Sequence, residues 1–305
     1  MAAGADQALN SPTALLAGAG SQIGVFATPR LLDAGFKVLA ISRSGAPVGL
    51  PALEGVQWVT EGEAVCHAGD CRHLLSAGPL DLALRLVDST PGLRRAVVFS
   101  STSVLSKQHS GNREERGLAA RMLELEARLL SAAVARGFGM SILRPTLVYG
   151  CGLDANISRL AGWVRRFGFV PVSSRASGLR QPVHADDLAA AAVRVLTSDR
   201  EFPGLITVAG GETLAYTEMV RRIFRALGKP ERLLHLPECL FAALAGAVGL
   251  VRPGGSINAE MVRRQALDLV FDDSEARELL DYDPRAFRPA AEDFTLPAFG
   301  ERPTR

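Results

Sequence analysis

The sequence has 305 residues, of which 48% are hydrophobic, and its formal net charge is +2. This length and composition allow a large core in one domain or in two joined lobes. The small net charge argues against a nucleic-acid partner, and four cysteines are too few for a disulfide scaffold of this size.

In chain order, the opening MAAGADQALNSP has neither a basic start nor an apolar run, so we expect a short loose tail and no secretory leader. Apolar strands then alternate with helical stretches, which is typical of βαβ units in a parallel sheet. The expected strands are TALLAG (13–18), KVLAIS (37–42), VQWVT (56–60), RHLLSA (72–77) and RAVVFSS (95–101). A helix is expected over 23–35, between the first two strands.

The stretch 112–136 predicts a long helix, because Leu118, Met122, Leu125 and Leu129 recur at three- and four-residue spacing. Asn112 is the expected N-cap, and Gly137 is expected to end this helix. Later elements are a strand at 140–145, a strand leading into a helix over 181–197, a strand at 205–210 and a helix over 217–227.

The most apolar segment, CLFAALAGAVGLV (239–251), is shorter than the roughly twenty residues needed to span a bilayer. We expect a buried helix there, with a helix in the membrane interface as the alternative. A cytoplasmic protein without a membrane span follows from this interpretation.

The order of elements predicts an α/β fold with a doubly wound parallel sheet of the Rossmann type and a smaller C-terminal substrate lobe. We expect the nucleotide-binding domain over 1–150 and about 180–210, and the substrate lobe over about 151–179 and 211–305.

A glycine-rich turn, with Gly18, Gly20 and Gly24, stands between the first strand and the first helix. Backbone N–H groups in such a turn can approach a pyrophosphate, and the N-terminus of the following helix adds a favourable dipole. A turn that only packs strand against helix is the structural alternative.

The second strand ends in Ser42 and Arg43, where an NAD-specific site would have an acidic residue. A hydroxyl and a guanidinium suit a 2′-phosphate, which favours NADP over NAD, although Arg43 can also be an ordinary exposed charge.

Several motifs follow one another in a familiar order: AGAGSQIG, LLSAGP, FSSTSV, ILRPTLVYG, RQPVHADDLA and DDSEARELLDYDPRAF. Together they resemble the extended and atypical short-chain dehydrogenase/reductases, especially the NAD(P)-dependent epimerase/dehydratase group, over most of the chain. The family's middle glycine falls on Ser21, a mild departure. The resemblance implies a dinucleotide in the N-terminal domain and a nucleotide-sugar or other small anionic substrate under the C-terminal lobe.

The glycine turn and the resemblance together define the expected site. The cofactor contacts are Gly18, Gly20, Ser21, Gln22, Ile23, Gly24, Ser42, Arg43, Ser76, Ala77, Gly78, Ser100, Pro145 and Leu147. Thr102, with Ser101 beside it, falls where the family keeps its catalytic Ser/Thr. Ser103, Asn156 and Arg180 are the expected substrate contacts, with Arg180 at a position where many nucleotide-sugar members hold a phosphate.

The family's usual catalytic pair, Tyr-x-x-x-Lys, is missing. The three tyrosines are Tyr149, Tyr216 and Tyr282, and none has a lysine four residues later. Alignment of Glu126 with the glutamate that commonly follows the family's lysine puts Leu118 and Met122 in the catalytic positions. Neither side chain can donate a proton, so the standard mechanism is in doubt.

Two other side chains are considered as proton donors. His109, beside Lys107, follows Thr102 on a loop expected to flank the pocket, and Tyr149 lies at the end of the sixth-strand motif. The competing interpretations are a solvated loop for His109 and a packing role for Tyr149.

Three further groups of polar residues have structural explanations that compete with functional ones. CHAGDCRH groups Cys66, His67, Cys71 and His73, but its spacing is not that of a zinc knuckle, so we expect no metal. The stretch 155–185 has five arginines and no acidic residue, which suits a diphosphate substrate, although an acidic partner, a membrane headgroup or a solvated face are alternatives. In HADDL, we expect Asp186 to cap the helix.

The leading hypothesis is an NADP-binding member of the epimerase/dehydratase group that acts on a nucleotide-sugar or another small anionic substrate. The runner-up is a non-catalytic NADP-binding sensor or assembly protein, and the third is an interaction module with an empty glycine loop. A homodimer is compatible with each of them.

Overall fold

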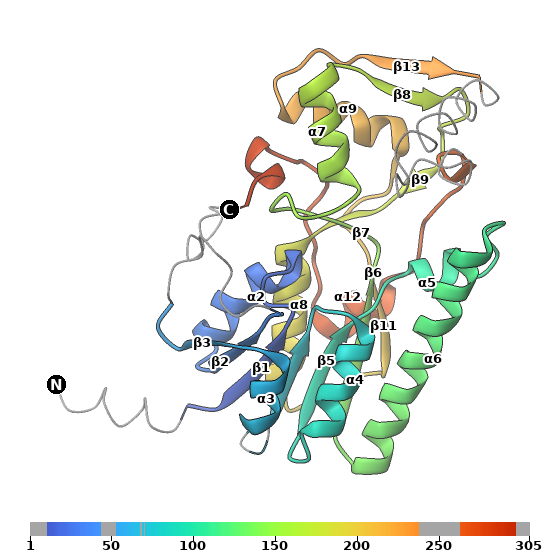
Figure 1. The fold of residues 1–305 in the computed structure, drawn as a ribbon. Helices are drawn as coiled ribbons and strands as arrows, with labels where there is room; N and C mark the ends of the chain where they lie inside the picture. Colours follow the sequence, from blue (N-terminus) through green and yellow to red (C-terminus); the bar gives the residue numbers. More distant parts are fainter. Residues whose placement is uncertain (1–10, 44–52, 68, 70, 238–262, 297–305) are drawn as a thin grey trace.

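The computed structural model describes residues 11–43, 53–67, 69, 71–237 and 263–296. Its centre is a seven-stranded sheet in the order β11-β6-β5-β4-β1-β2-β3, in which every neighbouring pair is parallel (Figure 1). The strands are β1 (Thr13–Ala17), β2 (Lys37–Ile41), β3 (Val56–Val59), β4 (His73–Ser76), β5 (Arg95–Phe99), β6 (Gly139–Pro145) and β11 (Leu205–Val208). The predicted doubly wound parallel sheet is confirmed.

The two faces of this sheet form two separate cores, because side chains along a strand alternate between faces. In β1, Ala14 and Leu16 belong to one core and Leu15 and Ala17 to the other. All four are fully buried. Helices on both faces therefore cover β1, whose buried residues are apolar toward each face, as buried parallel sheets require.

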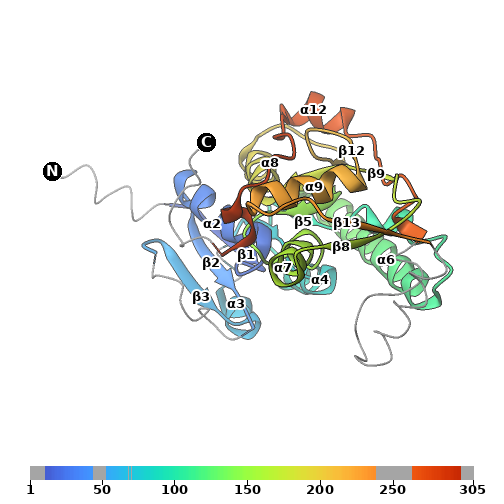
Figure 2. The ribbon, with the colours of Figure 1, turned by 90° about the horizontal axis from the view of Figure 1, so that it is seen from above.

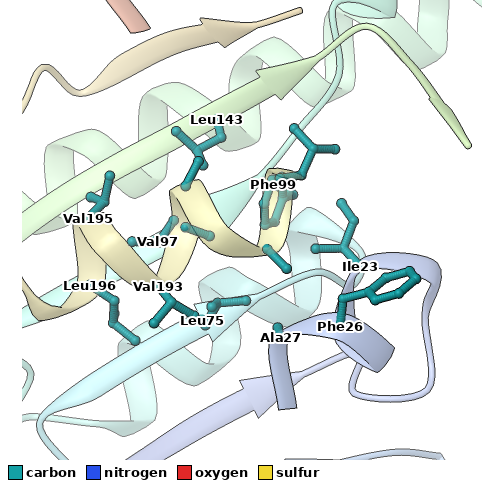
Figure 3. Close-up of a cluster of buried hydrophobic side chains, with 14 of the residues drawn as sticks. Ile23, Phe26, Ala27, Leu75, Val97, Phe99, Leu143, Val193, Val195 and Leu196 are labelled. Carbon is teal, nitrogen blue, oxygen red and sulfur yellow. The ribbon is translucent and has the colours of Figure 1, made fainter. Parts of the chain in front are cut away.

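One face is covered by α2 (Gln22–Asp33), α8 (Ala185–Thr197) and α12 (Ser274–Leu280). Val193, Val195 and Leu196 of α8 meet Leu75, Val97 and Leu143 of the strands, and Ile23 and Phe26 of α2 lie at the same core (Figure 3). The opposite face is covered by α3 (Glu61–His67), α4 (Leu80–Ser89) and α6 (Arg113–Arg136).

The long helix α6 begins and ends as its sequence predicts. The side chain of Asn112 accepts a hydrogen bond from the backbone N–H of Glu114, and Gly137 ends the helix in the left-handed conformation, with φ +68°. Glycine adopts this backbone without the steric cost of a Cβ atom. The short helix α5 (Ser103–Ser106) lies between β5 and α6.

A second layer lies over the carboxyl ends of the strands (Figure 1 and, from above, Figure 2). It contains β7 (Leu147–Tyr149), α7 (Ile157–Phe167), β8 (Val170–Ser173), β9 (Leu179–Arg180), β10 (Pro182–His184), β12 (Leu214–Ala215), α9 (Tyr216–Ala226), β13 (Leu233–Leu236) and the 3-10 helix η2 (Ala291–Phe294). Its core joins Tyr149, Phe224 and Phe287. The expected domain boundaries stay a prediction.

The apolar segment 239–251 lies outside the described residues. Within the part of the chain that is described, no helix has the length and hydropathy of a membrane span.

Candidate functional site

The glycine turn brings the end of β1, the start of α2 and the end of β4 into close contact. Gly18 has φ +70°, and a Cβ atom there would lie 2.7 Å from the carbonyl oxygen of Ala77 and 2.8 Å from the amide nitrogen of Gly78. A Cβ atom at Gly24 would lie 2.1 Å from the carbonyl oxygen of Gly18. Both positions therefore require glycine, for the tight turn and for close packing of helix on strand.

Helix α2 starts beside this turn with a side-chain cap. The Oγ of Ser21 accepts a hydrogen bond from the backbone N–H of Gly24, at 3.2 Å. Gly20, which precedes this cap, is exposed, and Ile23 is buried in the core below. The cap satisfies one of the free N–H groups of the first turn, and the helix dipole favours an anion at this end.

Three buried polar atoms along the carboxyl edge of the sheet have no hydrogen-bond partner. They are Nε2 of Gln22 at the start of α2, Oγ of Ser76 at the end of β4, and Oγ of Ser100 directly after β5. Two other such atoms in the described chain lie elsewhere, on His73 at the opposite end of β4 and on Trp163 in α7. Since buried polar groups are normally paired with protein, water or a ligand, these three atoms are candidates for contact with a bound molecule.

The strand-end segment after β5 is tied to the end of β6. The hydroxyl of Thr102 donates to the carbonyl oxygen of Pro145 at 3.0 Å, and the backbone N–H of Thr102 donates to the same oxygen. The Oγ of Ser101 accepts from the backbone N–H of Ser103. With its proton engaged, Thr102 has only acceptor capacity left for a substrate hydroxyl.

The register of α6 against the sheet is fixed by a buried ion pair between Glu126 and Arg144 of β6, with Nε 3.0 Å from Oε1. Glu126 is 2% exposed. Leu118 lies two turns earlier and is 51% exposed, while Met122 packs against the core below α6. The two positions that the alignment gives to tyrosine and lysine thus hold apolar side chains on the same helix.

Tyr149 lies in a packed aromatic cluster. It is 1% exposed, and its ring makes edge contacts with His184 at 5.0 Å and with Phe287 at 4.8 Å between centroids. Burial, with the nearby Asp293 carboxylate adding to it, raises the pKa of Tyr149 far above its ordinary value. This environment suits packing, and a role for Tyr149 in proton transfer stays a prediction.

Other predicted site residues lie on separate elements. His109 is exposed on the loop between α5 and α6, and Asn156 is exposed at the N-cap of α7. Arg43 is exposed at the end of β2, next to Ser42, whose N–H donates to Val59. Leu147 is half-buried at the start of β7. Their predicted roles stay predictions.

Arg180 does not point into open space. It is 5% exposed, and its guanidinium donates to the carbonyl oxygens of Leu179, Leu267 and Arg264, at 2.5–2.7 Å. Burial, with the charge of Arg264 adding to it, lowers the pKa of Arg180. In this arrangement Arg180 holds the turn 263–267 in place, so its expected contact with a substrate phosphate stays a prediction.

The start of α8 carries a polar network. His184 caps the helix, because its Nδ1 accepts from the N–H of Asp186, and its Nε2 lies 3.1 Å from Oδ1 of Asp293. The expected cap by Asp186 is therefore wrong: its carboxylate instead bridges Arg30 of α2 and Arg285. Asp293 and Arg285 were not found from the sequence, because each lies about a hundred residues from its partner.

The cysteine and histidine cluster does not converge. Cys71 is buried with its thiol toward the carbonyl of His67, whereas Cys66 is exposed on α3. Across the described ranges, no three His, Cys, Asp or Glu side chains are grouped to hold a metal ion.

No protein-family model matches the chain. The chain is 26% identical over 222 residues to the UDP-glucose 4-epimerase of Vibrio cholerae, and this match covers 70% of the chain and 65% of that protein. Its fold is similar to that of UDP-N-acetylglucosamine 4-epimerase from Bacillus cereus, with TM-score 0.67, 16% identity, and coverage of 93% and 98%. It is also similar to UDP-glucuronic acid 4-epimerase from Bacillus cereus in complex with UDP-glucuronic acid and NAD, with TM-score 0.66, 15% identity, and coverage of 90% and 94%. The resemblance that the motifs predict is confirmed.

Proposed function

We propose that this chain, a relative of the extended short-chain dehydrogenase/reductases of the epimerase/dehydratase group, binds a nicotinamide dinucleotide and a small anionic substrate. The observation that carries the proposal is the row of unpartnered polar atoms on Gln22, Ser76 and Ser100, next to the glycine turn. A dinucleotide laid along this edge offers phosphate, ribose and amide groups that can pair with all three.

The residues present fit such a group. Gly18 and Gly24 leave the turn free of side chains, and the N-terminus of α2 favours a pyrophosphate. When bound, a nicotinamide dinucleotide supplies hydride transfer. The chain itself supplies the turn, the hydroxyls of Ser76 and Ser100, and the acceptor oxygen of Thr102.

We propose NADP as the preferred dinucleotide, because Ser42 and Arg43 directly follow β2, where a carboxylate would select NAD. The solved UDP-glucuronic acid 4-epimerase contains NAD. The affinities of the chain for NADP and for NAD therefore have to be compared directly. The proposed preference for NADP depends on Arg43.

We propose a nucleotide-sugar as the substrate class. Support comes from the UDP-sugar epimerases with similar sequence or fold and from the second layer over the carboxyl ends of the strands, where small-molecule sites of open α/β sheets lie. The substrate and the cytoplasmic location expected from the sequence remain parts of this proposal.

Leu118, at the position that the alignment gives to the catalytic tyrosine, cannot donate a proton. Without a phenol and lysine on α6, proton transfer has to use another group, and the hydroxyl of Thr102 is already donated to Pro145. This favours a second candidate function for the same site, a dinucleotide-binding sensor or assembly protein without turnover.

The experiment is a fluorescence titration of the purified chain with NADPH and NADH. Separate samples that hold NADP⁺ or NAD⁺, which can accept hydride, then receive UDP-sugars while the nicotinamide absorbance and the identity of the sugar are recorded. Saturable binding supports the site, and an absorbance change with a UDP-sugar identifies the enzyme. Binding with neither an absorbance change nor conversion of the sugar supports the sensor, because an epimerase returns the hydride and leaves no net reduction. Failure of both dinucleotides to bind overturns the proposal.

A further inference from the structure

An outer patch of aromatic, apolar and basic side chains lies at the end of the second layer farthest from the central sheet, where β8 and β13 run side by side (Figure 1). The outer patch consists of Arg166 and Phe167 at the end of α7, Phe169 before β8, and Arg232 and Leu234 in and before β13. The second layer separates it from the carboxyl edge of the central sheet, so it is not part of the proposed dinucleotide site.

Three apolar side chains of the outer patch are open to solvent. Phe167 is 46% exposed, Phe169 38% and Leu234 50%, and the two phenyl rings lie 6.5 Å apart between centroids. Leu233 pairs with Val170 across the two strands, and both side chains pack in or against the core of the second layer. Because side chains alternate along a strand, Leu234 is directed away from this core. Large apolar groups gathered at one surface are typical of an interaction site.

Phe167 is held in its exposed position by two neighbours. The ring of Trp163, one turn earlier on α7, lies 4.4 Å from it between centroids, and the guanidinium of Arg166 lies 5.2 Å from its centroid. A guanidinium over a ring keeps its charge in water while its stem covers apolar surface. Arg165 turns elsewhere and donates to the carbonyl of Phe294. Of the two adjacent arginines, Arg166 therefore belongs to the outer patch.

The charges of the outer patch have one sign. Arg166 and Arg232 are exposed, and neither forms an ion pair with a carboxylate of the described residues. Glu231, beside Arg232 in the chain, is engaged by Arg225 at 2.6 Å. The stretch 155–185, which includes most of the outer patch, contains no acidic residue. An anionic surface is therefore the electrostatic complement of the outer patch.

We propose that the outer patch docks this chain on the headgroup region of an anionic phospholipid bilayer. Half-exposed phenyl rings beside arginines suit this boundary, because the rings can enter the upper acyl region while the guanidinium groups stay with the lipid phosphates. Two arginines and three apolar side chains contribute far less than a spanning helix does, so the association is reversible. Docking of this kind requires neither a dinucleotide nor a substrate.

Sedimentation of the full chain with vesicles measures the docking. The probes are vesicles of phosphatidylcholine alone and vesicles of an equal mixture of phosphatidylcholine and phosphatidylglycerol. We expect binding to the mixed vesicles that weakens as salt is raised, and much weaker binding to the neutral vesicles, because the arginines act through charge. Equal binding to both kinds of vesicle, or binding to neither, overturns the inference.

A pair of charge variants locates the contact. Arg166→Gln with Arg232→Gln should weaken binding to the mixed vesicles about twenty-fivefold, since one arginine near an anionic surface contributes about fivefold. Arg121→Gln with Arg128→Gln removes the same charge from exposed positions on α6 and should bind nearly as wild type does. An equal loss in the two double variants would show that net charge attracts the chain, and the outer patch would then have no special role.

A second pair of variants examines the apolar side chains. Phe167→Ser with Phe169→Ser should weaken binding to the mixed vesicles about tenfold, because less apolar area leaves water on docking. Val134→Ser, at a position on α6 that is 85% exposed, is the control and should bind as wild type does. Unchanged binding by the serine double variant overturns the inference. If that variant does not fold, as judged by its melting curve, the charge variants decide.

An acidic protein surface is the other electrostatic complement of the outer patch. Polyglutamate, titrated into the full chain by calorimetry, offers carboxylates without acyl chains. We expect it to bind weakly and to be insensitive to the serine changes at Phe167 and Phe169. Polyglutamate binding that is stronger than vesicle binding, and that those serine changes reduce, would overturn the bilayer as the partner.

Discussion

The carboxylate of Glu126 and the guanidinium of Arg144 form a buried two-point ion pair that joins α6 to β6. The pair joins the helix that carries Leu118 to the strand that ends in Pro145, directly after Arg144. Its geometry decides which residues of α6 face the end of the sheet.

Glu126→Gln should therefore destabilise the fold strongly. The change leaves Arg144 buried with a weakened partner, and breaking such a pair typically costs about 3–5 kcal/mol. Urea unfolding followed by circular dichroism measures the effect. Glu124→Gln, an exposed change on the same helix, should stay within about 0.5 kcal/mol of wild type, and equal stability of the two variants would show that the pair does not hold the register.

The double change Leu118→Tyr with Met122→Lys should restore the missing proton donor. Leu118 is half-exposed, so a phenol has space there, whereas Met122 packs against the core and its replacement lowers stability. We expect nicotinamide absorbance changes with a UDP-sugar that are faster than in wild type. Leu118→Phe with Met122→Lys is the control without the hydroxyl. If the tyrosine variant binds both ligands and behaves as this control does, the assigned register is wrong.

Arg43→Ala should remove the preference for NADP. The exposed guanidinium contributes only where a 2′-phosphate is present, so NADPH affinity should fall about tenfold while NADH affinity stays constant. Parallel fluorescence titrations provide the comparison. Arg121→Ala, an exposed arginine on α6, should change neither affinity, and an unchanged ratio of the two affinities in Arg43→Ala would contradict the role of β2.

Ser100→Ala should weaken dinucleotide binding without lowering the stability of the ligand-free protein. Its Oγ is buried without a partner, so removing it should leave the ligand-free melting temperature unchanged or slightly raised. The rise in melting temperature on adding dinucleotide should become smaller. Thr90→Val is the contrasting control: its hydroxyl donates to Leu86 at 2.7 Å, so we expect a loss of about 1 kcal/mol and no change in the dinucleotide effect. Equal ligand-induced shifts in wild type and Ser100→Ala would exclude contact with the hydroxyl.

Stability should depend on pH through Asp293. Burial opposes its ionisation, but hydrogen bonds from His184 and from the N–H of Ala290 outweigh it and lower the pKa of this carboxyl. A lowered folded-state pKa stabilises the protein above the unfolded value of about 3.9, and this contribution is lost as pH falls through the folded pKa.

Asp293→Asn should accordingly be less stable than wild type at neutral pH and lose less stability on acidification below about pH 4. Unfolding curves across this range measure the slope. Glu201→Gln, an exposed change, should follow the wild-type slope, and identical slopes for Asp293→Asn and wild type would refute the linkage.

The sequence predicts the sheet and its helices well because the signals are local. Apolar runs, the glycine turn and the spacing of Leu125 and Leu129 depend on neighbours within one or two turns, and the structure confirms these elements. Contacts such as Glu115 with Arg264, or His184 with Asp293, join residues more than a hundred positions apart. Their side chains have no periodic signature, so only the folded chain reveals them. The same holds for Arg180, whose partners are backbone carbonyls.

The order of the strands also bears on how the chain is made. The first 150 residues contain six of the seven strands, but β11 at the edge beside β6 and helix α8 over α2 come later. When only the first 150 residues have been made, β6 is therefore an unpaired strand edge and the apolar face of α2 is uncovered. Both features favour aggregation. This edge and this face stay uncovered until Val208 has been made.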